Sequence, residues 1–420
     1  MRFCHKTFVE FSQRKIVERF DKEIKKCYNK KVAFVEKCRK ERRKWVMVEI
    51  IEVTTRKQRK EFVEYPLRLY RGNRYFVPPF YGDEMKMFTD KNIYRKTCQS
   101  VFFLAVRNGK TVGRVQGIIQ NQYNEIHNAK QVRFTRFDCE DNTETAKLLL
   151  EAVETWGKNM GMTQIVGPLG YSDLEREGLL IEGFDKEQTF EEQYNYEYYA
   201  SLIEACGYEK DVDWVEHRLF KMLDDKERLN KLFDKSLEKY HLHLGGVGMR
   251  KGAFIKKYAS GIFHCIDECY KDLYGTVPFT QEMAKQVVSQ FKLAINPKYV
   301  CVICDEKENV VAFGMALPGL GEAVQKSGGR LTLGCLFRLL KAIKKPRTLD
   351  LALVGILPEY RKAGLSACML VIMGNMVEDK DVEYMETNLN LEDNLAIQAT
   401  WKRFEHIQHK RRRCYKKEIV

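Results

Sequence analysis

Residues 353–367 read Leu-Val-Gly-Ile-Leu-Pro-Glu-Tyr-Arg-Lys-Ala-Gly-Leu-Ser-Ala, and this stretch decides the fold. Its apolar start predicts a β-strand that runs into a short loop, and a helical pattern follows the loop directly. Arg361 and Lys362 bring positive charge to the start of that helix, and Gly364 allows close backbone approach to a ligand. Since N–H groups at a helix N-terminus attract anions, the stretch is either a diphosphate site or an ordinary strand-to-helix turn.

The segments around this stretch predict a mixed α/β protein built twice. The order strand, helical region, hairpin, strand, helix, strand, helix, strand occurs over residues 47–222 and again over 223–420. In the first copy, two β-rich runs within Val101–Ile119 flank the turn Asn108-Gly109, which is a strong hairpin signal. No Gly/Ser-rich or Pro-rich linker separates the copies. We therefore expect two related α/β domains with mixed sheets that pack together.

The stretch Pro358-Glu-Tyr-Arg-x-x-Gly resembles the acyl-CoA pyrophosphate loop of the GNAT (N-acetyltransferase-like) superfamily, which usually reads Arg/Gln-x-x-Gly-x-Gly/Ala. The element order of each copy is also similar to the GNAT order. The resemblance thus covers residues 47–420 and implies two GNAT-like domains in tandem. Four segments of the first copy resemble bacterial tandem GNAT-like proteins of poorly defined function: 109–114, 167–169, 177–185 and 194–196.

The resemblance implies that the second copy binds acetyl-CoA or a longer acyl-CoA as co-substrate, and that no metal takes part. It implies CoA contacts from the end of the strand, the loop, the start of the helix and one residue further on: Gly355, Ile356, Leu357, Arg361, Lys362, Ala363, Gly364, Leu365, Ser366 and Asn394. Asn394 would contact the pantetheine arm or the phosphates. A backbone N–H near 354–357 would hold the thioester carbonyl.

Three positions depart from the GNAT pattern. Ser366 stands where the family prefers Gly or Ala, although a serine still offers its N–H. Trp401 stands seven residues after Asn394, where the family often has a tyrosine as general acid for the leaving thiolate. The first copy has Phe137-Asp-Cys-Glu-Asp-Asn in place of the loop, so we expect it to shape the acceptor site or the interface instead of holding CoA.

An amine that attacks a thioester must lose a proton, so the site needs a carboxylate near the fourth and fifth strands. Glu386, Asp350 and Glu392 are the candidates. We predict Glu386 as the general base because it lies in a predicted strand and not in a solvated turn. The alternative is that Glu386 is a surface carboxylate or a partner of the basic C-terminal tail.

The net charge of +14 comes mostly from one short leader. Residues 1–46 carry 16 basic and 6 acidic residues, whereas the remaining 374 carry 56 and 52. The codons for Glu41-Arg-Arg can form a purine-rich ribosome-binding site just before Met47, so one hypothesis is that translation begins at Met47. The alternative is a genuine basic arm that is solvated or binds an anionic partner. Without the leader, the charge is too small to predict nucleic-acid binding.

Composition excludes two classes of protein. With 44% hydrophobic and 12% aromatic residues the chain is not a disordered protein, and no apolar run reaches the length of a membrane span. The 13 scattered cysteines fit buried thiols in a cytoplasmic protein, and their spacing, like that of His241 and His243, does not predict a metal site. His409–Arg413 is a basic cluster that could bind RNA or phosphate, but a solvated strand or a charge partner is favoured.

Leu331–Lys345 alternates an apolar helical stripe with basic residues, between the predicted third and fourth strands of the second copy. It could receive a lipid acceptor or touch a membrane surface, or it could simply pack on the sheet.

Taken together, the sequence predicts an acyl-CoA-dependent N-acyltransferase that transfers an acetyl or longer acyl group to an amine of a small-molecule or lipid-like acceptor. The alternative is an inactive tandem GNAT scaffold that binds a CoA-like ligand or a protein. A basic nucleic-acid-binding protein is the third reading.

Overall fold

The computed structural model describes residues 30–31 and 47–419. Residues 1–46, on which the start-site hypothesis depends, lie outside the described residues apart from 30 and 31. The chain divides into a small unit, Met1–Glu49 with Arg107–Lys110, and a large unit, Ile50–Val106 with Thr111–Val420. The large unit carries the fold and the candidate site.

The first copy alternates strands and helices. Its elements are, in chain order, β1 (Glu49–Glu52), α2 (Arg56–Leu69), α3 (Tyr81–Lys86), η1 (Ile93–Lys96), β2 (Cys98–Arg107), β3 (Lys110–Gln120), α4 (Asn121–Ile126), β4 (Gln131–Cys139), α5 (Thr143–Asn159), β5 (Gln164–Gly167), β6 (Leu179–Glu182), α6 (Tyr198–Ala205) and β7 (Glu209–Met222). Asn108 and Gly109 have φ angles of 53° and 71°, the left-handed backbone that a two-residue hairpin needs. The predicted hairpin is therefore confirmed.

The second copy follows a similar order. Its elements are α7 (Lys226–Lys239), β8 (His243–Leu244), α8 (Lys251–Tyr270), α9 (Gln281–Phe291), η2 (Pro297–Tyr299), β9 (Val300–Cys304), β10 (Val310–Pro318), α10 (Gly321–Gln325), α11 (Leu333–Lys344), β11 (Thr348–Ile356), η3 (Pro358–Tyr360), α12 (Leu365–Val377), β12 (Tyr384–Thr387), β13 (Asn390–Leu391), α13 (Leu395–Trp401) and β14 (Phe404–Glu418). The strand, loop and helix predicted from residues 353–367 are β11, η3 and α12. The predicted α/β class is confirmed.

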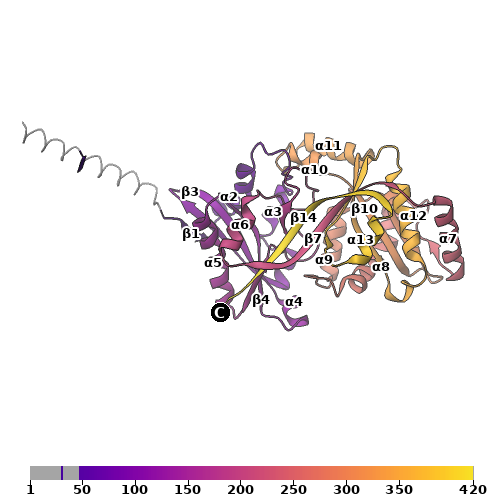
Figure 1. Cartoon of the computed structure of the whole chain (residues 1–420), viewed down its shortest axis with the longest axis horizontal. Coiled ribbons are helices and arrows are strands. Elements are labelled where there is room, and N and C mark those ends of the chain that lie inside the picture. Colours follow the sequence, from indigo (N-terminus) through magenta and orange to yellow (C-terminus); the bar gives the residue numbers. More distant parts are fainter. Residues whose placement is uncertain (1–29, 32–46, 420) are drawn as a thin grey trace, which may run out of the picture. The chain divides into compact units, whose positions relative to one another are not determined.

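The described strands form one 14-stranded sheet, whose main path is β1-β2-β3-β4-β5-β14-β7-β12-β11-β10-β9-β8. β14, from the second copy, lies between β5 and β7 of the first copy. β7 in turn pairs with β12 of the second copy. Figure 1 shows β7 and β14 running side by side over most of their length. The two copies thus exchange their last strands, and the predicted boundary at 222/223, directly after β7, stays a prediction.

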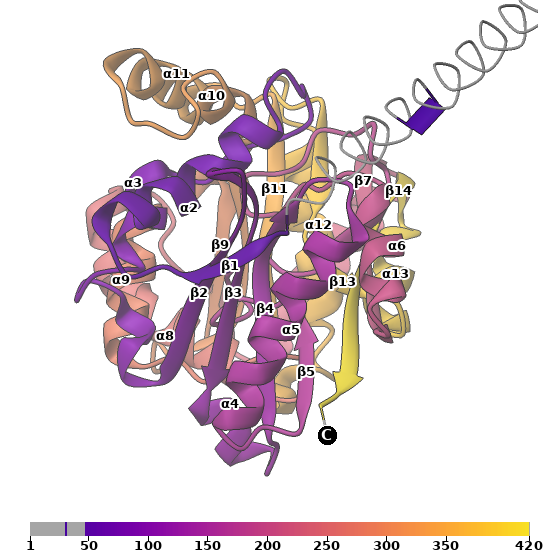
Figure 2. The same ribbon diagram turned by 90° about the vertical axis from the view of Figure 1, so that its left-hand side faces the viewer.

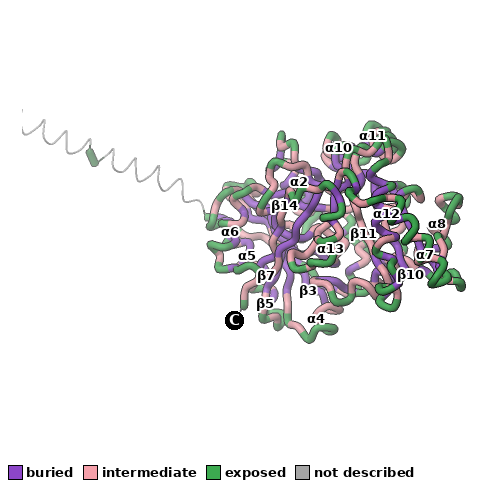
Figure 3. Tube along the Cα trace, turned by 45° about the vertical axis from the view of Figure 1, so that its right-hand side comes forward, coloured by how far each residue is buried: buried purple, intermediate pink, exposed green. Residues whose placement is uncertain are grey.

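The core lies along this sheet. In the first copy α5 packs on β4, and Figure 2 shows it crossing that part of the sheet. In the second copy, buried side chains of α8, α12 and β9–β11 form a continuous apolar cluster. Figure 3 shows β7 buried over its middle part, with many of the exposed residues on the outer helices and turns. Within the described residues, no helix combines the length and the apolar character needed to cross a bilayer.

Several element boundaries differ from the prediction. The sequence of residues 56–65 predicts a charged helix that Pro66 ends. Instead α2 continues to Leu69, because residues around the proline are buried and tertiary packing holds the last turn. Residues 384–391 predict a single strand, but they form two short strands, β12 and β13, that pair with neighbours at different places. α7 and β6 were not predicted. α7 is a mostly polar helix, and β6 has only four residues.

Candidate functional site

The loop before α12 has the backbone of an anion site. Gly364 has φ +77° and caps α12, and an added Cβ at this position would meet Ser236 Oγ at 2.7 Å. Arg361, Lys362 and Ser366 are exposed around it. Because the first N–H groups of an α-helix have no partner within the helix, the start of α12 offers donors where the two cationic side chains gather.

The neighbouring strands β11 and β12 separate next to this loop. They pair in parallel only from Thr348↔Tyr384 to Leu351↔Thr387. On the other side of β11, the register with β10 slips so that Ala352 is an extra residue, a β-bulge. Asn388 Nδ2 donates to the Ala352 carbonyl across the opening at 3.2 Å. Strand separation and bulge together place irregular backbone of β11 at the wall of a cavity.

Tyr270, at the end of α8, contacts the backbone of Val354, within the stretch 354–357 that was expected to hold the thioester carbonyl. Its hydroxyl donates to the Val354 carbonyl at 3.0 Å and accepts from the Val354 N–H at 3.1 Å. Both residues line the cavity. Burial raises the pKa of Tyr270 above its ordinary value, so the phenol keeps its proton at neutral pH. No pattern in the sequence pointed to this residue, because α8 is distant from β11 along the chain.

The cavity at this opening has a volume of about 340 Å³. Most of its wall is apolar, from α8, α12 and β10, and includes Phe254, Ile262, Phe263, Met315, Met369 and Met373. A cavity of this size lies within the range of ~300–1,000 Å³ that is usual for small-molecule sites. Flexible methionine side chains suit a wall that adapts to a hydrocarbon chain.

Six carboxyl groups also line this cavity: Asp173, Glu175, Glu177, Glu191, Glu192 and Asp350. Among the described residues of the wall, none is Lys, Arg or His. Five of the six carboxyls come from the first copy. Asp173 Oδ1 is buried without a hydrogen-bond partner among the described residues. Two of the six carboxyls already contact basic side chains: Glu192 lies 3.1 Å from Arg412 Nη2, and Glu175 lies 3.7 Å from Arg136 Nη1. The other four, together with the apolar wall, fit a ligand that is apolar and cationic.

Burial raises the pKa of several of these carboxyls. It raises the pKa of Asp173 to about 6 and that of Glu191 to about 7. Burial, and then the negative charge of Glu386, raise the pKa of Asp350 well above its ordinary value. Asp350 and Glu386 are register partners on β11 and β12, which explains why one charge acts on the other. A carboxyl of raised pKa is suited to proton transfer near neutral pH.

Glu386, the predicted base, has a different environment. It is buried on β12, with its carboxylate oxygens 2.9 Å from Lys410 Nζ, 3.0 Å from Arg218 Nε and 2.8 Å from His409 Nε2. Burial opposes ionisation, but Lys410 and His409 hold the pKa of Glu386 far below its ordinary value. The side chain is not part of the cavity wall. These contacts match the alternative in which Glu386 is a partner of the basic C-terminal tail, and not the one in which it is a surface carboxylate.

Asn394 and Trp401 both line the cavity. Asn394 Oδ1 caps α13 by accepting from the Ile397 N–H at 3.2 Å. Trp401 is buried, and its indole N–H donates to Asn390 Oδ1 at 2.7 Å. Of the predicted CoA residues, Asn394 thus lies at the cavity, while the others form the end of β11 and the adjacent loop.

No family model matches the chain. Two curated proteins are similar over most of its length. Protein YghO of Escherichia coli (strain K12) is 25% identical over 370 residues, which cover 86% of this chain and 93% of YghO. The bacterial ceramide synthase of Caulobacter vibrioides (strain NA1000 / CB15N) is 24% identical over 386 residues, 88% of this chain and 97% of the synthase.

Solved structures decide the fold. A tandem GNAT protein from the clavulanic acid biosynthesis pathway superposes with a TM-score of 0.50 at 13% identity, over 89% of this chain and 99% of that chain. The chain has the tandem GNAT fold. A GCN5-related glucosamine N-acetyltransferase region of a fungal multi-domain β-N-acetylglucosaminidase superposes with a TM-score of 0.52 at 12% identity, over 89% of this chain and 38% of that one.

The basic C-terminal tail is a structural part of this GNAT fold. Lys410 and Arg412 are fully buried and contact Glu216 at 2.9 and 2.7 Å. Arg413 contacts Asp213 at 2.8 Å. The expectation of a solvated strand is therefore wrong for Lys410 and Arg412, because β14 runs through the middle of the sheet and its cations neutralise carboxylates of β7. RNA binding by this cluster loses its support.

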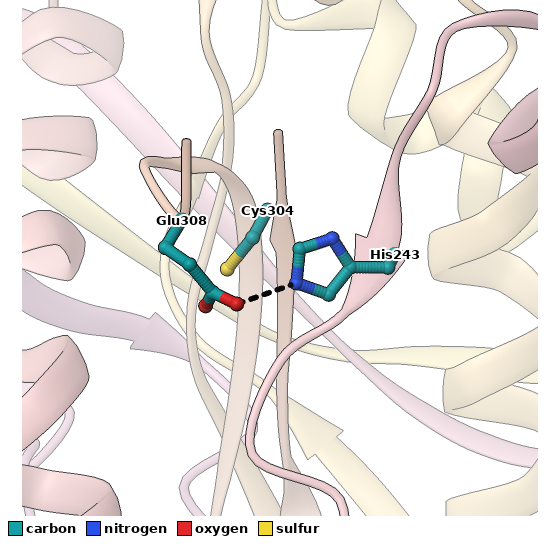
Figure 4. A group of neighbouring side chains, drawn as sticks. All are labelled: His243, Cys304 and Glu308. Carbon is teal, nitrogen blue, oxygen red and sulfur yellow. Dashed lines mark ion pairs between the residues drawn. The ribbon is translucent and has the colours of Figure 1, made fainter. Parts of the chain in front are cut away.

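Two groups of side chains have the composition of a metal site. His243, Cys304 and Glu308 lie within reach of one ion, with His243 Nε2 3.3 Å from Glu308 Oε1 (Figure 4). Lys257 Nζ already lies 2.9 Å from the same carboxylate, and burial raises the pKa of the Cys304 thiol to about 11. In the second group, Glu216, Glu386 and His409, Lys410 supplies the positive charge. In both groups a lysine already neutralises a carboxylate that a metal ion would need as a ligand.

The first copy was expected to shape the acceptor site or the interface, but the carboxyls that it contributes to the cavity were not identified from the sequence. Segment 177–185 was noted only as a resemblance, yet Glu177 lines the wall together with Asp173 and Glu191. The signal was an unusual density of acidic residues in 173–192, a stretch with little regular structure. Only the folded chain shows that this stretch faces the second copy.

Proposed function

We propose that the protein is an acyl-CoA-dependent N-acyltransferase whose acceptor is a long-chain amine. The observation that carries the proposal is the cavity, with its apolar wall, six carboxyls and no basic side chain among the described lining residues. An acyl chain needs the apolar wall, and an ammonium group needs the carboxyls. A small polar amine would not need an apolar cavity of about 340 Å³.

The co-substrate would bind along the strand end and loop. Arg361 and Lys362, with the N–H groups at Gly364 and Ser366, would hold the diphosphate. The remaining predicted contacts would follow the pantetheine arm toward the cavity: Gly355, Ile356, Leu357, Ala363, Leu365 and Asn394. The acyl group, acetyl or longer, would then lie at the β11 bulge. The ten described cysteines are all free thiols, which suits the reducing cytoplasm where acyl-CoA is made.

In the reaction the acceptor nitrogen attacks the thioester carbonyl, so a C–N bond forms and the C–S bond breaks. The nitrogen's proton passes to a carboxylate, for which we propose Asp350, since Glu386 is held ionised by three basic neighbours. The leaving thiolate takes a proton from a nearby acid. Tyr270, whose hydroxyl lies at Val354, is the candidate, because Trp401 has no phenolic proton.

A distant relative supports the acceptor class. The Caulobacter protein is named a ceramide synthase, and a ceramide is the N-acyl derivative of a long-chain amino alcohol. Such an acceptor has one amine and a long hydrocarbon chain, and its hydroxyls could donate to an acceptor atom such as Asp173 Oδ1.

The test uses the exposed Ser366 in the first turn of α12. In Ser366→Glu a negative charge would repel the diphosphate, while an acidic residue at a helix N-terminus does not harm the helix. We expect long-chain acyl-CoA to raise the Tm of wild type and of the control Ser366→Ala, but not of Ser366→Glu. With sphinganine as acceptor, mass spectrometry should detect the N-acyl product from the first two proteins only. Absence of any stabilisation by acetyl-CoA, long-chain acyl-CoA or CoA would defeat the proposal.

The second candidate function is a scaffold that binds acyl-CoA without turnover. It is favoured by Trp401 at the position of the expected tyrosine. Its signature would be stabilisation by acyl-CoA that Ser366→Glu abolishes, with no amide product from any amine tested.

A further inference from the structure

Helix α11 has apolar residues on two faces. On the inner face Cys335 and Leu339 are buried, and Leu339 with Ile343 lines a second cavity of about 260 Å³. On the outer face Leu333 and Phe337 are 89% and 72% exposed. Figure 3 shows this helix among the exposed parts of the molecule. In a helix that only packs on a sheet, most of the apolar side chains would be covered.

The exposed apolar side chains are neighbours on one helical stripe. Leu336 and Leu340 are 42% and 47% exposed, and they follow Leu333 and Phe337 at helical spacing; Leu331, just before the helix, is 67% exposed. Scattered single apolar residues on a surface are normal, whereas a contiguous group marks an interaction site.

The chain segment that carries this stripe is basic, although Lys326, Arg330 and Arg347 pair with Glu322, Glu64 and Glu383. Between Glu322 and Asp350 there are seven basic residues and no acidic one: Lys326, Arg330, Arg338, Lys341, Lys344, Lys345 and Arg347. Lys341, Lys344 and Lys345 are exposed at the C-terminal end of the stripe. An exposed apolar stripe beside lysines is the pattern of a helix that lies in the interface of an anionic bilayer.

The second cavity, which the inner face of α11 lines, adjoins the candidate site. It shares wall residues with the first cavity, among them Leu174, Phe190, Phe291 and Leu320. Helix α11 therefore exposes Phe337 on one face. On its other face, Leu339 and Ile343 line a space that adjoins the first cavity. The residues that the two cavities share include apolar side chains, which a hydrocarbon chain entering from α11 could contact.

We propose that α11 docks the protein on a bilayer that contains anionic phospholipid. The occupant of the exposed stripe is the boundary between headgroups and acyl chains, and the lysines contact the phosphates. The inference rests on the proposed function only for why docking is useful: a long-chain amine resides in membranes. Docking itself is measured without any catalysis.

The experiment is vesicle flotation with the full chain, using phosphatidylcholine vesicles and vesicles that also contain phosphatidylglycerol. Wild type should float with the anionic vesicles and bind the neutral ones at least about tenfold more weakly. Leu333→Gln/Phe337→Gln should lose the apolar anchor, and Lys341→Glu/Lys344→Glu the attraction; each should weaken binding about tenfold or more. The control, Val247→Gln/Ile407→Gln, removes exposed apolar residues from other elements and should float like wild type.

Equal flotation of wild type and the α11 variants would overturn the inference. So would a finding by light scattering that Leu333→Gln/Phe337→Gln converts a dimer to a monomer while flotation is unchanged, since the stripe would then cover a second copy. The proposed function is tested apart from this, by acylation of a short-chain amine in solution. That reaction should survive the α11 variants and fail in Ser366→Glu, so the two ideas can fail separately.

Discussion

Asp350 and Glu386 are register partners on neighbouring strands but have opposite electrostatic environments. Glu386 contacts three basic side chains, whereas burial and the charge of Glu386 raise the pKa of Asp350. We expect Asp350→Asn to lower kcat for amine acylation by about 10²–10⁴-fold with little change in Tm. Glu386→Gln should lower Tm, because Lys410 loses a buried partner. If Asp350→Asn keeps wild-type kcat, Asp350 is not the proton acceptor; the control is Glu392→Gln, the third carboxylate considered.

The pH dependence of acylation follows from the same group. A general base acts when deprotonated, so kcat/KM should fall as pH falls through the pKa of Asp350, which burial places above that of an ordinary carboxyl. The acceptor amine also titrates, so the profile must be measured with two acceptors of different amine pKa. A limb of the pH profile that has the same midpoint with both acceptors reports a group of the enzyme. A limb that always follows the acceptor would contradict the assignment.

Glu191 provides a stability test of the acidic cavity. Burial raises the pKa of Glu191 from 4.5 to about 7, so between these pH values the folded protein holds a proton that the unfolded chain releases. The contribution of Glu191 to the free energy of unfolding therefore falls as pH rises across this window. Glu191→Gln should equal wild type at pH 4 and be more stable by up to about 3 kcal/mol above pH 7. Chemical denaturation at both pH values checks this, with the exposed Glu405→Gln as control; a constant difference would contradict it.

At the scale of elements, the turn into α12 makes a separable prediction. Gly364→Ala places a side chain at φ +77° and a Cβ 2.7 Å from Ser236 Oγ. The left-handed backbone alone costs about 1–2 kcal/mol, and the clash adds to it. Ser236→Ala/Gly364→Ala removes the clash and should recover that part of the stability but not the backbone part. Urea unfolding of wild type, Gly364→Ala, Ser236→Ala and the double variant measures the coupling energy between the two positions. Strict additivity of the two single changes in unfolding free energy would show that α7 does not constrain the loop.

The local sequence pattern predicted an element correctly where the element depends on neighbouring residues in the sequence and not on distant partners. The Asn108-Gly109 hairpin and the helix that follows the loop, α12, were predicted because a turn residue or an apolar run suffices there. Pro66 did not end α2, and residues 384–391 split into two strands, because partners distant in the sequence hold them. The loop at Gly364 could be predicted for the same reason as α12. The contact of Tyr270 with Val354 depends on α8 meeting β11 within the second copy, and the place of Asp173 in the cavity wall depends on the two copies meeting.

At the scale of the whole molecule, the exchange of last strands predicts a single cooperative unit. β14 lies between β5 and β7, and Lys410 on β14 contacts Glu216 of β7 and Glu386 of β12. Calorimetry should show one unfolding transition in place of two. Lys410→Met leaves buried carboxylates unpaired and should destabilise by about 3–5 kcal/mol, moving the whole transition. Two transitions, of which Lys410→Met shifts only one, would show that the copies unfold separately.

The exchange also sets an order of events during synthesis. β14 follows every other described element in the chain, yet its place is in the interior of the sheet between two strands made about two hundred residues earlier. A ribosome adding about 5–20 residues per second would leave the edges of β5 and β7 without their partner for some tens of seconds at the slower rates. During that time the edges of β5 and β7 that later pair with β14 have unpaired backbone N–H and C=O groups. A chaperone or a strand of a neighbouring chain can bind these edges before β14 is made.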